Sequence, residues 1–533
     1  MKIKHATTPS DAPSPFVTQH AQDVIGVLSG FDRLRLMATL RPLYQPSFMM
    51  SYLSRANVLL KDFAAFTSGW TERVRAAAHQ LAGQHQRPLT YLHTSSQRKE
   101  LLARDLARRD GLTSGLIGIW SVVEPCLTYF VRKDREQKKL VLRLEPGKCL
   151  HYYFYFLHAQ LGLLHLRLQT WFPFALHLCL NGRHWLARQL DQHGLGYVQR
   201  ENCFTWMEDV PRAQALAREQ LQSHWPALLQ PLVEQCHPHA AELCRPLGLS
   251  YYWSVSESEY ATDVMFKNSA ALARLYPSLI RQGIQHFGST DVLRFLGHKT
   301  PASGRVHGNH AGEVLSSLKG RPEGLRLKHQ ANGNSIKLYD KQGSVLRVET
   351  TMNRPHEFRV YRASERDPEQ KKRWQVLRKS VGDLHRRAEI CEAANGRYLE
   401  ALAGVRAGQS AGAVAQRVCQ PVEKDGRRHR GLNPWAKDDA ALLEVISRGE
   451  WAVAGFRNRD VRAALYPAKA DADEQRRRSG RVTRALARLR AHGLIRKVSG
   501  THRYQVTASG RPILTALLAA RQADVEKLIA LAA

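Results

Sequence analysis

QRRRSGRVTRALARLRAHGLIRKVSGTHRY, the stretch from Gln475 to Tyr504, predicts the fold of the C-terminal end of the chain. Apolar Val482, Leu486 and Leu489 recur at helical spacing and give this predicted helix a face to bury. After Gly493, two short basic strands at 494–498 and 502–506 are separated by a turn. A basic helix followed by such a hairpin is typical of a winged helix-turn-helix. The candidate nucleic-acid contacts are the cations of this helix and hairpin: Arg476, Arg477, Arg478, Arg481, Arg484, Arg488, Arg496, Lys497 and Arg503.

Three further helices complete the predicted C-terminal domain. Residues 438–447 predict its first helix, 458–465 its second, 473–492 the reading helix and 509–521 a closing helix. We expect the reading helix to lie in the major groove of duplex DNA, with the hairpin on phosphates or in the minor groove. The alternative is a winged helix that serves protein contact or dimerisation. Because the arginines occupy the reading helix itself, the pattern favours DNA or RNA.

The charge of the whole chain favours the same class of partner. Its 533 residues carry 79 Lys and Arg against 47 Asp and Glu, a net charge of +32. A positive field of this size attracts a polyanion, so DNA or RNA is expected. A membrane is not expected, because the most apolar stretch, 151–180, is interrupted by His158, His165, Arg167 and Pro173. The N-terminus lacks a secretory signal, which predicts a cytoplasmic protein.

Length and composition predict several domains of a mixed α/β (α+β) class. The expected divisions are a disordered tail at 1–15, a mixed α/β core domain at 16–210, a helical and β-containing basic domain at 211–408, a linker at 409–436 and the winged helix-turn-helix domain at 437–533. The linker is rich in Gly, Pro and Arg, which makes this boundary the clearest along the chain.

Hydrophobic periodicity predicts several elements within the first two domains. A strand with one buried face is expected at 24–40, followed by helix over 46–81. A strand-helix-strand series follows at 88–92, 98–109 and 115–123, which favours an α/β layer. Farther along, strands at 325–329 and 335–339 are joined through Asn332-Gly333, and a third strand follows at 344–350.

Acidic side chains at the ends of apolar strands are conspicuous in so basic a protein. Asp32 lies in the first predicted strand and Glu124 closes another, while a third carboxylate could come from Glu257, Glu259 or Asp263. We take Asp32, Glu124 and Asp263 as candidate catalytic residues that would hold Mg²⁺ for phosphodiester cleavage or transfer. The alternative is that these carboxylates pair with nearby arginines.

A second candidate for catalysis is the predicted strand Lys337-Leu338-Tyr339-Asp340-Lys341. It resembles the Tyr-Asp/Asn-Lys strand of rolling-circle replication initiators, in which a tyrosine attacks a phosphodiester. Those enzymes usually use a metal-binding histidine pair, and this chain offers only His237-Pro238-His239. The alternative is a basic hairpin that contacts a nucleic-acid backbone through Lys328, Lys337 and Lys341.

Two further groups of residues have weaker functional interpretations. Cys236, His237, His239 and Cys244 could ligate zinc, but their crowding lacks the usual pair of ligand knuckles. The eight cysteines form no CxxC pair, which is typical of reduced thiols. Aromatic residues between 165 and 185 could stack on single-stranded bases, although their apolar character favours a place in the core.

Four stretches together resemble a widespread family of bacterial proteins that often end in a winged helix. They are Gln169–Phe174, Leu180–Arg183, Asn202–Phe204 and Gly333–Lys341. The resemblance covers nearly the whole chain and implies a bacterial protein that is linked to a mobile element. No catalytic residue follows from it.

Three functions are compatible with these patterns. The first is a nucleic-acid-binding protein, for DNA or structured RNA, of a mobile element or a regulatory system. The second is a Mg²⁺-dependent nuclease or transposase-like enzyme. The third is a scaffold that packages RNA in a ribonucleoprotein, for which dispersed positive charge would suffice.

Overall fold

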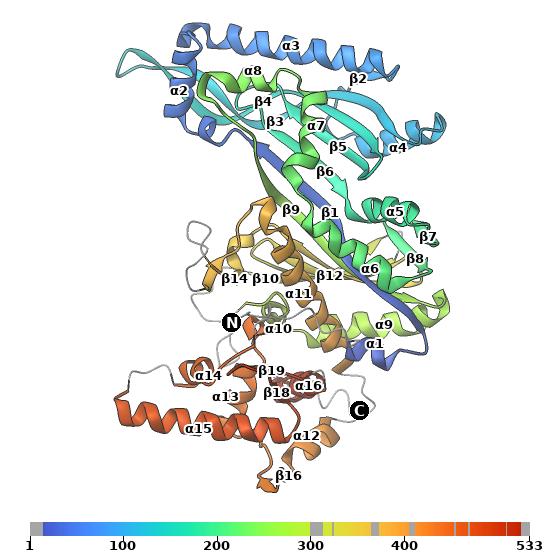
Figure 1. Ribbon diagram of the computed structural model, residues 1–533, viewed down its shortest axis with the longest axis vertical. Coiled ribbons are helices and arrows are strands. Elements are labelled where there is room, and N and C mark those ends of the chain that lie inside the picture. The colour runs from blue at the N-terminus through green and yellow to red at the C-terminus, as the bar shows by residue number, and fades with distance from the viewer. Residues whose placement is uncertain are drawn as a thin grey trace.

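A single large sheet organises the first three-quarters of the protein. The computed structural model describes residues 14–298, 313–321, 324–363, 372–404, 411–451, 455–466, 470–507 and 509–523. The sheet has eleven strands in the order β10-β11-β12-β13-β9-β1-β6-β5-β4-β3-β2. Figure 1 shows it running from β3 and β4 at the top of the view to β9 and β12 near the middle, with the C-terminal helices below. The protein is therefore a mixed α/β protein, as the sequence predicts.

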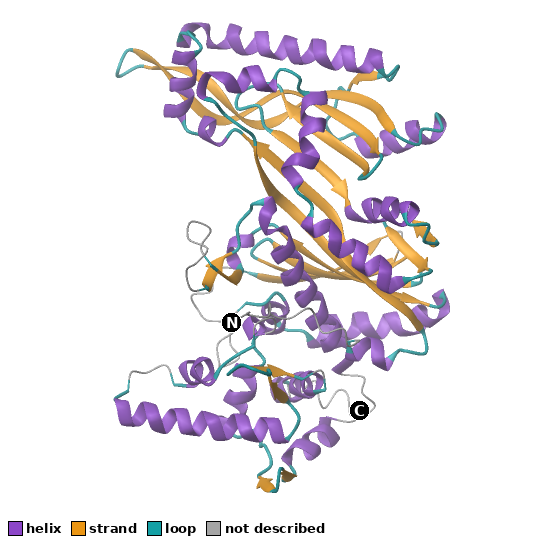
Figure 2. Ribbon diagram, viewed as in Figure 1, coloured by secondary structure: helices purple, strands orange, loops and turns teal. Residues whose placement is uncertain are grey.

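Almost every neighbouring pair of strands in this sheet is antiparallel. The strands are β1 (Val24–Thr39), β2 (Leu89–Tyr91), β3 (Gly115–Asp134), β4 (Lys139–His158), β5 (Gly162–Gln169), β6 (Leu176–Asn181), β9 (Tyr252–Phe266), β10 (Val314–Arg321), β11 (Gly324–Ala331), β12 (Asn334–Lys341) and β13 (Val345–Met352). Only β2 and β3 pair in parallel, with α4 (Lys99–Arg109) between them, so the predicted strand-helix-strand series is confirmed. Figure 2 shows the long strands of the sheet in orange among the helices.

The sheet is shared by the two domains expected at 16–210 and 211–408. β1 lies between β6, from the first of these segments, and β9, from the second. β1 pairs with β9 along its whole length, from Val24 opposite Phe266 to Thr39 opposite Tyr252. It pairs with β6 over its second half, from Arg33 opposite Asn181 to Ala38 opposite Leu176. Long-range antiparallel pairing of this kind is invisible to local periodicity, because a strand pattern does not name its partner.

Helices bury the two halves of the sheet in separate cores. Against β1 and β3–β6 pack α2 (Pro46–Arg55), α3 (Phe63–Gln84) and α7 (Trp225–Cys236), through residues such as Tyr52, Trp70 and Trp225. Against β9 and β11–β13 pack α9 (Ser269–His286) and α10 (Ser289–Phe295). The long helix α11 (Leu384–Gly404) contributes to both cores, since Leu384 lies in the first and Tyr398 in the second.

Shorter elements cover the ends and edges of the sheet. The remaining helices of this part are α1 (Pro15–Gln19), α5 (Gly182–Gln192), α6 (Val210–Glu219) and α8 (Ala240–Cys244). Two hairpins lie outside the sheet, formed by β7 (Tyr197–Arg200) with β8 (Cys203–Met207) and by β14 (Arg359–Arg362) with β15 (Arg373–Val376). The helix expected over 46–81 is interrupted, because α2 ends at Arg55 and α3 begins at Phe63.

The C-terminal segment has its own apolar core. It contains α12 (Ala411–Cys419), β16 (Val422–Lys424), β17 (Arg427–His429), α13 (Lys437–Ile446), α14 (Asn458–Leu465), α15 (Ala472–Ala491), β18 (Ile495–Lys497), β19 (Tyr504–Val506) and α16 (Gly510–Gln522). Val414 and Val418 of α12 pack in this core beside Leu443 of α13 and Leu486 of α15. Much of the stretch expected as a linker, 409–436, therefore has regular structure and belongs to this segment.

Two expectations concern the ends of the chain and the membrane. The tail predicted at 1–15 lies outside the described residues, except for Ser14, which caps α1, and Pro15. Among the helices that the structure describes, none combines the length and the apolar character needed to cross a bilayer.

Candidate functional site

A β-bulge places two charged residues at the centre of the sheet. Between the partner pairs Phe31–Tyr260 and Leu34–Ser258, β1 has both Asp32 and Arg33 whereas β9 has only Glu259. The extra residue of a bulge breaks the strict alternation of side chains and redirects them. Here Asp32 is buried, while the side chain of Arg33 keeps 38% of its surface exposed.

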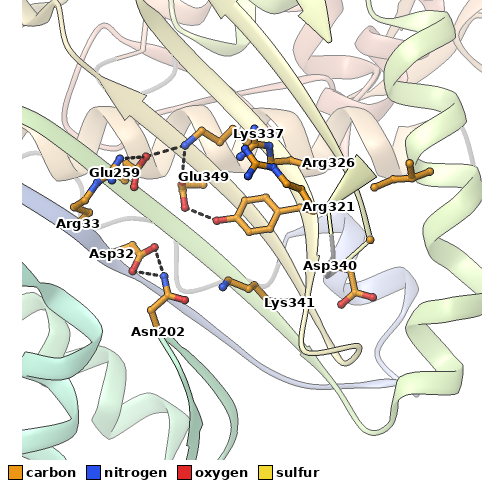
Figure 3. A pocket seen from close by; sticks show the side chains of 13 residues that line it. Asp32, Arg33, Asn202, Glu259, Arg321, Arg326, Lys337, Asp340, Lys341 and Glu349 are labelled. Carbon is orange, nitrogen blue, oxygen red and sulfur yellow. Dashed lines mark hydrogen bonds and ion pairs between the residues drawn. The ribbon is translucent and has the colours of Figure 1, made fainter. Parts of the chain in front are cut away.

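The bulge opens onto a polar cavity of about 290 Å³. Figure 3 shows side chains from β1, β9, β12 and β13 turned toward one another here. Three carboxylates, Asp32, Glu259 and Glu349, lie among cations. The lining residues that carry charge, a hydroxyl or an amide are Asp32, Arg33, Asn202, Glu259, Arg321, Arg326, Lys337, Tyr339, Asp340, Lys341 and Glu349. The cavity therefore suits a polar, charged ligand rather than an apolar one.

Lys337 and Tyr339, on the same face of β12, hold Glu349 of the neighbouring strand. The Lys337 Nζ donates to Glu349 Oε1 at 2.6 Å and to Glu259 Oε1 at 2.8 Å. The Tyr339 hydroxyl donates to Glu349 Oε2 at 2.5 Å. Arg33 donates to Glu259 Oε1 at 2.8 Å. Each carboxylate at the inner end of the cavity thus has a cationic partner.

Burial and these partners set the protonation of the group. Burial raises the pKa of Glu349, but Lys337 and Arg347 outweigh it and lower that pKa to about 2. Burial alone would lower the pKa of Lys337, yet Glu349 and Glu259 raise it above the ordinary value. The pKa of Tyr339 is raised by burial and by the charge of Glu349. At neutral pH the cavity therefore holds an ammonium, a carboxylate and an un-ionised phenol in contact.

Beneath the cavity lies a buried ion network centred on Arg347. Arg347 has no exposed surface and donates to Asp32 at 3.0 Å and to Asp263 at 2.5 and 2.8 Å. Asn202 supplies two further hydrogen bonds to Asp32, at 2.9 and 2.7 Å. Arg183 pairs with Asp263 at 3.0 Å. Opposite charges compensate one another here, which is the condition for burying them.

The structure does not bring together the three carboxylates predicted for catalysis. Asp32 and Asp263 share Arg347, but Glu124 lies on β3, with β6, β5 and β4 between it and β1. There Glu124 pairs with Lys99 at 3.0 Å and accepts from the Tyr153 hydroxyl at 2.7 Å. The pairing with nearby cations that the sequence left as an alternative is what the structure shows for all three.

A different carboxylate group could hold a cation. One oxygen from each of Asp32, Glu259 and Glu349 lies within 4.8 Å of the other two. Carboxylate oxygens are the ligands that Mg²⁺ prefers. The sequence pattern predicts Glu259 as a candidate but not its combination with Glu349. Glu349 comes close to β1 only because β13 pairs with β9.

The three lysines predicted to contact a nucleic-acid backbone have different surroundings. Lys337 is engaged by Glu259 and Glu349, and its side chain keeps 12% of its surface exposed. Lys328 donates to Gln330 at 2.8 Å, and burial lowers its pKa. Lys341 lines the cavity and lies 3.5 Å from Glu201. Of the three, Lys337 is the one whose charge is compensated by two carboxylates.

The histidines and cysteines considered for zinc are not grouped as ligands. His237 is fully buried, and its ring stacks on Phe174 with centroids 6.0 Å apart. His239 contacts Arg73 at 3.1 Å. Among the described residues, Cys236 and Cys244 do not join them around one point. No histidine is among the described residues that line the cavity beside Tyr339.

The aromatic segment before α5 belongs to the core. Phe172 and Phe174 have no exposed surface, and Trp171 is half-buried. This agrees with the core interpretation that their apolar character favoured. Arg183, in the first turn of α5, is buried in the Arg347 network.

The second candidate site is the cationic surface of α15. Arg476, Arg477, Arg481 and Arg484 are exposed, and none of the four forms an ion pair with any residue that the structure describes. Val482, Leu486 and Leu489 on the other face are buried in the C-terminal core, as predicted. After α15, Arg496 and Lys497 of β18 are exposed as well.

Four of the arginines predicted to contact nucleic acid from this helix and hairpin have partners within the protein. One of them, Arg496, donates to the Gln505 side chain at 3.2 Å. Arg488 packs inward and pairs with the buried Asp439 of α13. Arg478 lies 3.0 Å from Glu474 and over the ring of Tyr466. Arg503 donates to the Gly455 carbonyl at 3.2 Å. A helix 20 residues long presents arginines on every side, so the count of arginines overstates the free charge.

No protein-family model, curated protein or solved structure matches this chain in the comparisons made with each.

Proposed function

We propose that this chain is a nucleic-acid-binding protein whose C-terminal segment acts as a winged helix-turn-helix. The observation that carries the proposal is the row of exposed arginines on α15 that lack acidic partners among the described residues. In such a module α14 and α15 form the helix-turn-helix and β18–β19 the wing. Duplex DNA is the partner that best fits a helix in a major groove.

The contact between α14 and α15 supports this assignment. The Asn458 side chain donates to the Ser479 carbonyl at 3.0 Å and to the Thr483 hydroxyl at 2.9 Å. These bonds hold the start of α14 against the middle of α15. The buried Val461 of α14 lies in the same apolar core as Val482. A rigid helix pair positions cations without a large entropic cost on binding.

Removal of three free arginines from α15 tests the proposal. The variant Arg477→Gln/Arg481→Gln/Arg484→Gln keeps the buried face intact, so the fold should persist. We expect it to bind mixed-sequence duplex DNA at least tenfold more weakly than the unchanged chain, because each lost arginine gives up a phosphate contact. Fluorescence anisotropy of the full chain, titrated at constant low salt, measures this.

A matched control separates local contact from net charge. The variant Arg104→Gln/Arg108→Gln/Arg109→Gln removes the same charge from α4, in the sheet-containing part of the molecule. It should keep most of the affinity. Equal losses in the two variants would show that dispersed charge alone attracts the polyanion, which is the behaviour of an RNA-packaging scaffold. The same titration with structured RNA tests which polymer is preferred.

A second candidate function is Mg²⁺-dependent cleavage or transfer of a phosphodiester at the cavity. The arrangement that favours it is the close approach of Asp32, Glu259 and Glu349 beside the Tyr339 hydroxyl. Two mechanisms are possible there. A metal held by the carboxylates could activate water, or the Tyr339 oxygen could attack while Glu349 accepts its proton.

Cleavage of labelled DNA and RNA with and without Mg²⁺ tests this second function. Glu349→Gln should abolish cleavage by either mechanism, because Glu349 belongs to the carboxylate group and is the acceptor of the Tyr339 proton. Glu124→Gln should retain it, because Glu124 lies outside the cavity. Tyr339→Phe distinguishes the mechanisms, since only a tyrosine attack leaves a covalent protein–nucleic acid adduct that this change removes. If Mg²⁺ produces no cleavage by the unchanged chain, the cavity has no such role and binding alone remains.

A further inference from the structure

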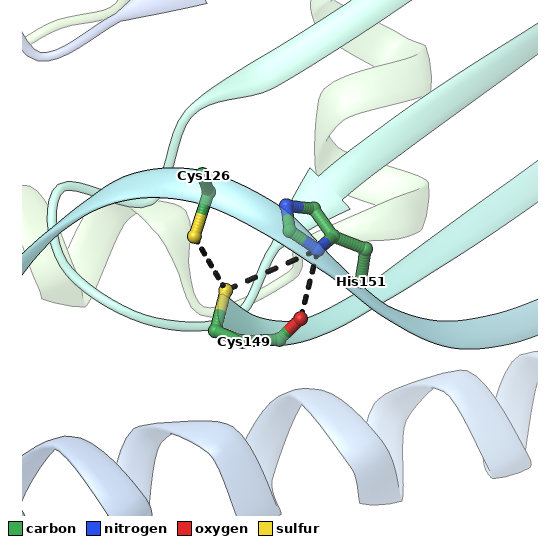
Figure 4. A group of neighbouring side chains, drawn as sticks. All are labelled: Cys126, Cys149 and His151. Carbon is green, nitrogen blue, oxygen red and sulfur yellow. Dashed lines mark hydrogen bonds between the residues drawn. The ribbon is translucent and has the colours of Figure 1, made fainter. Parts of the chain in front are cut away.

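Two thiols from neighbouring strands lie in contact outside both sites. Figure 4 shows the side chains of Cys126 on β3 and Cys149 on β4 beside one another. Their Sγ atoms are 3.4 Å apart. They are offset diagonally across the strand pair, because Cys126 is opposite Gly147 and Cys149 is opposite Glu124. His151 lies beside them, with its Nδ1 3.9 Å from the sulfur of Cys149. Two sulfurs and a ring nitrogen within 4.8 Å could in principle bind a soft metal ion or react with each other.

The tautomer of His151 decides between these chemistries. The Arg167 Nη2 lies 2.9 Å from His151 Nε2, and a guanidinium can only donate. Nε2 must therefore accept, which leaves the ring proton on Nδ1. That proton points to the Cys149 carbonyl, 3.0 Å from Nδ1. Ligation of a metal through Nδ1 would require moving the proton to Nε2, directly against Arg167. His151 is thus a hydrogen-bond donor here, and only two sulfur ligands remain.

The two thiols differ in access and in acidity. Cys126 is half-buried, whereas only 8% of the surface of Cys149 is exposed. The hydrogen bond with Cys149 lowers the pKa of Cys126 despite its partial burial, and the charge of Arg167 acts in the same direction. The same contact and burial raise the pKa of Cys149. A partly exposed thiol of lowered pKa beside a buried thiol is the asymmetry that thiol oxidation uses.

We propose that Cys126 and Cys149 form a reversible disulfide on oxidation by a hydroperoxide. The Cys126 thiol loses its proton to solvent, and the thiolate attacks the terminal hydroxyl oxygen of the hydroperoxide. An S–O bond forms and the O–O bond breaks, which leaves a sulfenic acid on Cys126. The departing alkoxide takes up a proton from solvent and leaves as an alcohol, or as water in the case of hydrogen peroxide. The Cys149 sulfur then attacks the Cys126 sulfur. The S–S bond forms, the S–O bond breaks, and the departing hydroxide leaves as water with the Cys149 proton. A dithiol and one hydroperoxide thus give a disulfide, an alcohol and water.

The two sulfurs lie close to bonding distance. A disulfide needs the sulfurs about 2.05 Å apart, so they must approach by roughly 1.4 Å. Among the described residues, no other cysteine belongs to this group of two thiols and a histidine. Cys419 is exposed, while Cys179, on β6, is half-buried. In a reducing compartment a disulfide of this kind would be transient rather than structural.

Peptide mapping of the full chain tests the proposal. After brief treatment with hydrogen peroxide and alkylation of the remaining thiols, non-reducing digestion should yield one linked peptide pair containing Cys126 and Cys149. A thiol reductant should separate it. In Cys149→Ser, Cys126 should stop at a sulfenic acid that dimedone traps. In Cys419→Ser, the matched control, the link should form as in the unchanged chain.

Two results would overturn the proposal. One is direct conversion of Cys126 to sulfinic or sulfonic acid in the unchanged chain, with no linked peptide. The other is one bound zinc ion per chain that Cys126→Ser removes and that protects both thiols from alkylation, because the site would then be a metal site. Circular dichroism of each variant verifies that the sheet remains folded.

Discussion

At the scale of single residues, Arg347 does most to hold the polar centre of the molecule together. It is fully buried, and both of its carboxylate partners, Asp32 and Asp263, are buried with it. Three strands thus meet through one side chain: β1, β9 and β13. An arginine suits this position because its planar guanidinium donates several hydrogen bonds in fixed directions.

Replacing Arg347 should therefore be costly. In Arg347→Leu, Asp32 would be left buried with only amide donors, and Asp263 with Arg183 alone. Removing one member of a buried ion network typically costs about 3 to 5 kcal/mol. The midpoint of urea unfolding, followed by tryptophan fluorescence, should fall accordingly. Arg35→Leu is the control, since its ion pair with Glu257 is half-exposed and should contribute no more than about 1 kcal/mol.

Replacing His237, in contrast with replacing Arg347, should stabilise the protein at acid pH. Neither of its ring nitrogens has a hydrogen-bond partner among the described residues. Burial, followed by the charges of His239 and Arg73, lowers its pKa from 6.5 to about 3. Between these two pKa values His237 is protonated in the unfolded chain but neutral in the folded chain. The free energy of unfolding therefore falls as the pH drops from 6.5 towards 3.

His237→Phe should remove this acid sensitivity. The ring would still stack on Phe174. At pH 5 we expect a gain of about 2 kcal/mol over the unchanged chain, from 1.36 kcal/mol for each pH unit below 6.5. The difference should shrink above pH 7. Urea unfolding of both chains across this range measures it, and a gain that does not depend on pH would contradict the account.

For some single residues, the local sequence pattern alone predicts the environment of the side chain. Asp32 was predicted as a site residue because an acid interrupts an alternating strand, and it lines the cavity. Phe172 and Phe174 were expected in the core because they are too apolar for the surface, and both are buried. Glu349 was not assigned to the carboxylate group, because only the pairing of β13 with β9 places it there. Glu124 was assigned to that group wrongly for the same reason, since its place at a strand end says nothing about the strand's neighbours.

At the scale of elements, the two faces of α15 have different roles. Val482, Leu486 and Leu489 bury one face, and Arg488 lies with them through its pair with Asp439. Arg484, one turn earlier, is exposed. Helical period alone predicts the apolar stripe. It does not reveal that Asp439, on another helix, draws one arginine inward.

This division predicts different outcomes for two neighbouring arginines. Arg488→Ala should lower the thermal unfolding temperature of the C-terminal segment, because it leaves Asp439 buried with only the exposed Arg430 as a charged partner. Arg484→Ala should leave that temperature nearly unchanged and instead weaken DNA binding. Calorimetry of the full chain and anisotropy titrations separate the two effects. If both variants lost affinity without loss of stability, Arg488 would face the nucleic acid.

Most elements were predictable, and their assembly was not. The boundaries of α14, α15 and β12 differ from those expected by two residues or fewer, because capping residues, glycines and periodicity are local signals. The bulge at Asp32 and Arg33 was missed, since an inserted residue looks like ordinary alternation until the partner strand is known.

Across the whole molecule, the positive charges are compensated by carboxylates to different extents in different places. In the sheet, many cations are matched by carboxylates, as Lys337 and Arg347 are. On α15, exposed arginines gather along one element, and none of Arg476, Arg477, Arg481 and Arg484 has an acidic partner in the described part of the chain. The net charge of +32 thus has at least one surface on which it is free to meet phosphates. Composition predicts the class of partner, but only the structure distinguishes cations that are already paired from those that are not.

The salt dependence of DNA binding by the full chain tests this account most directly. Four free arginines on α15 that each displace a counterion from a phosphate should contribute a slope of about −3.6 to a plot of log Kobs against log salt, at about 0.9 per contact. We predict tight binding at low salt with a slope at least this steep, which flattens in Arg477→Gln/Arg481→Gln/Arg484→Gln. Absence of binding at low ionic strength, or a slope that the three substitutions leave unchanged, would show that α15 is not the nucleic-acid-binding surface of this chain.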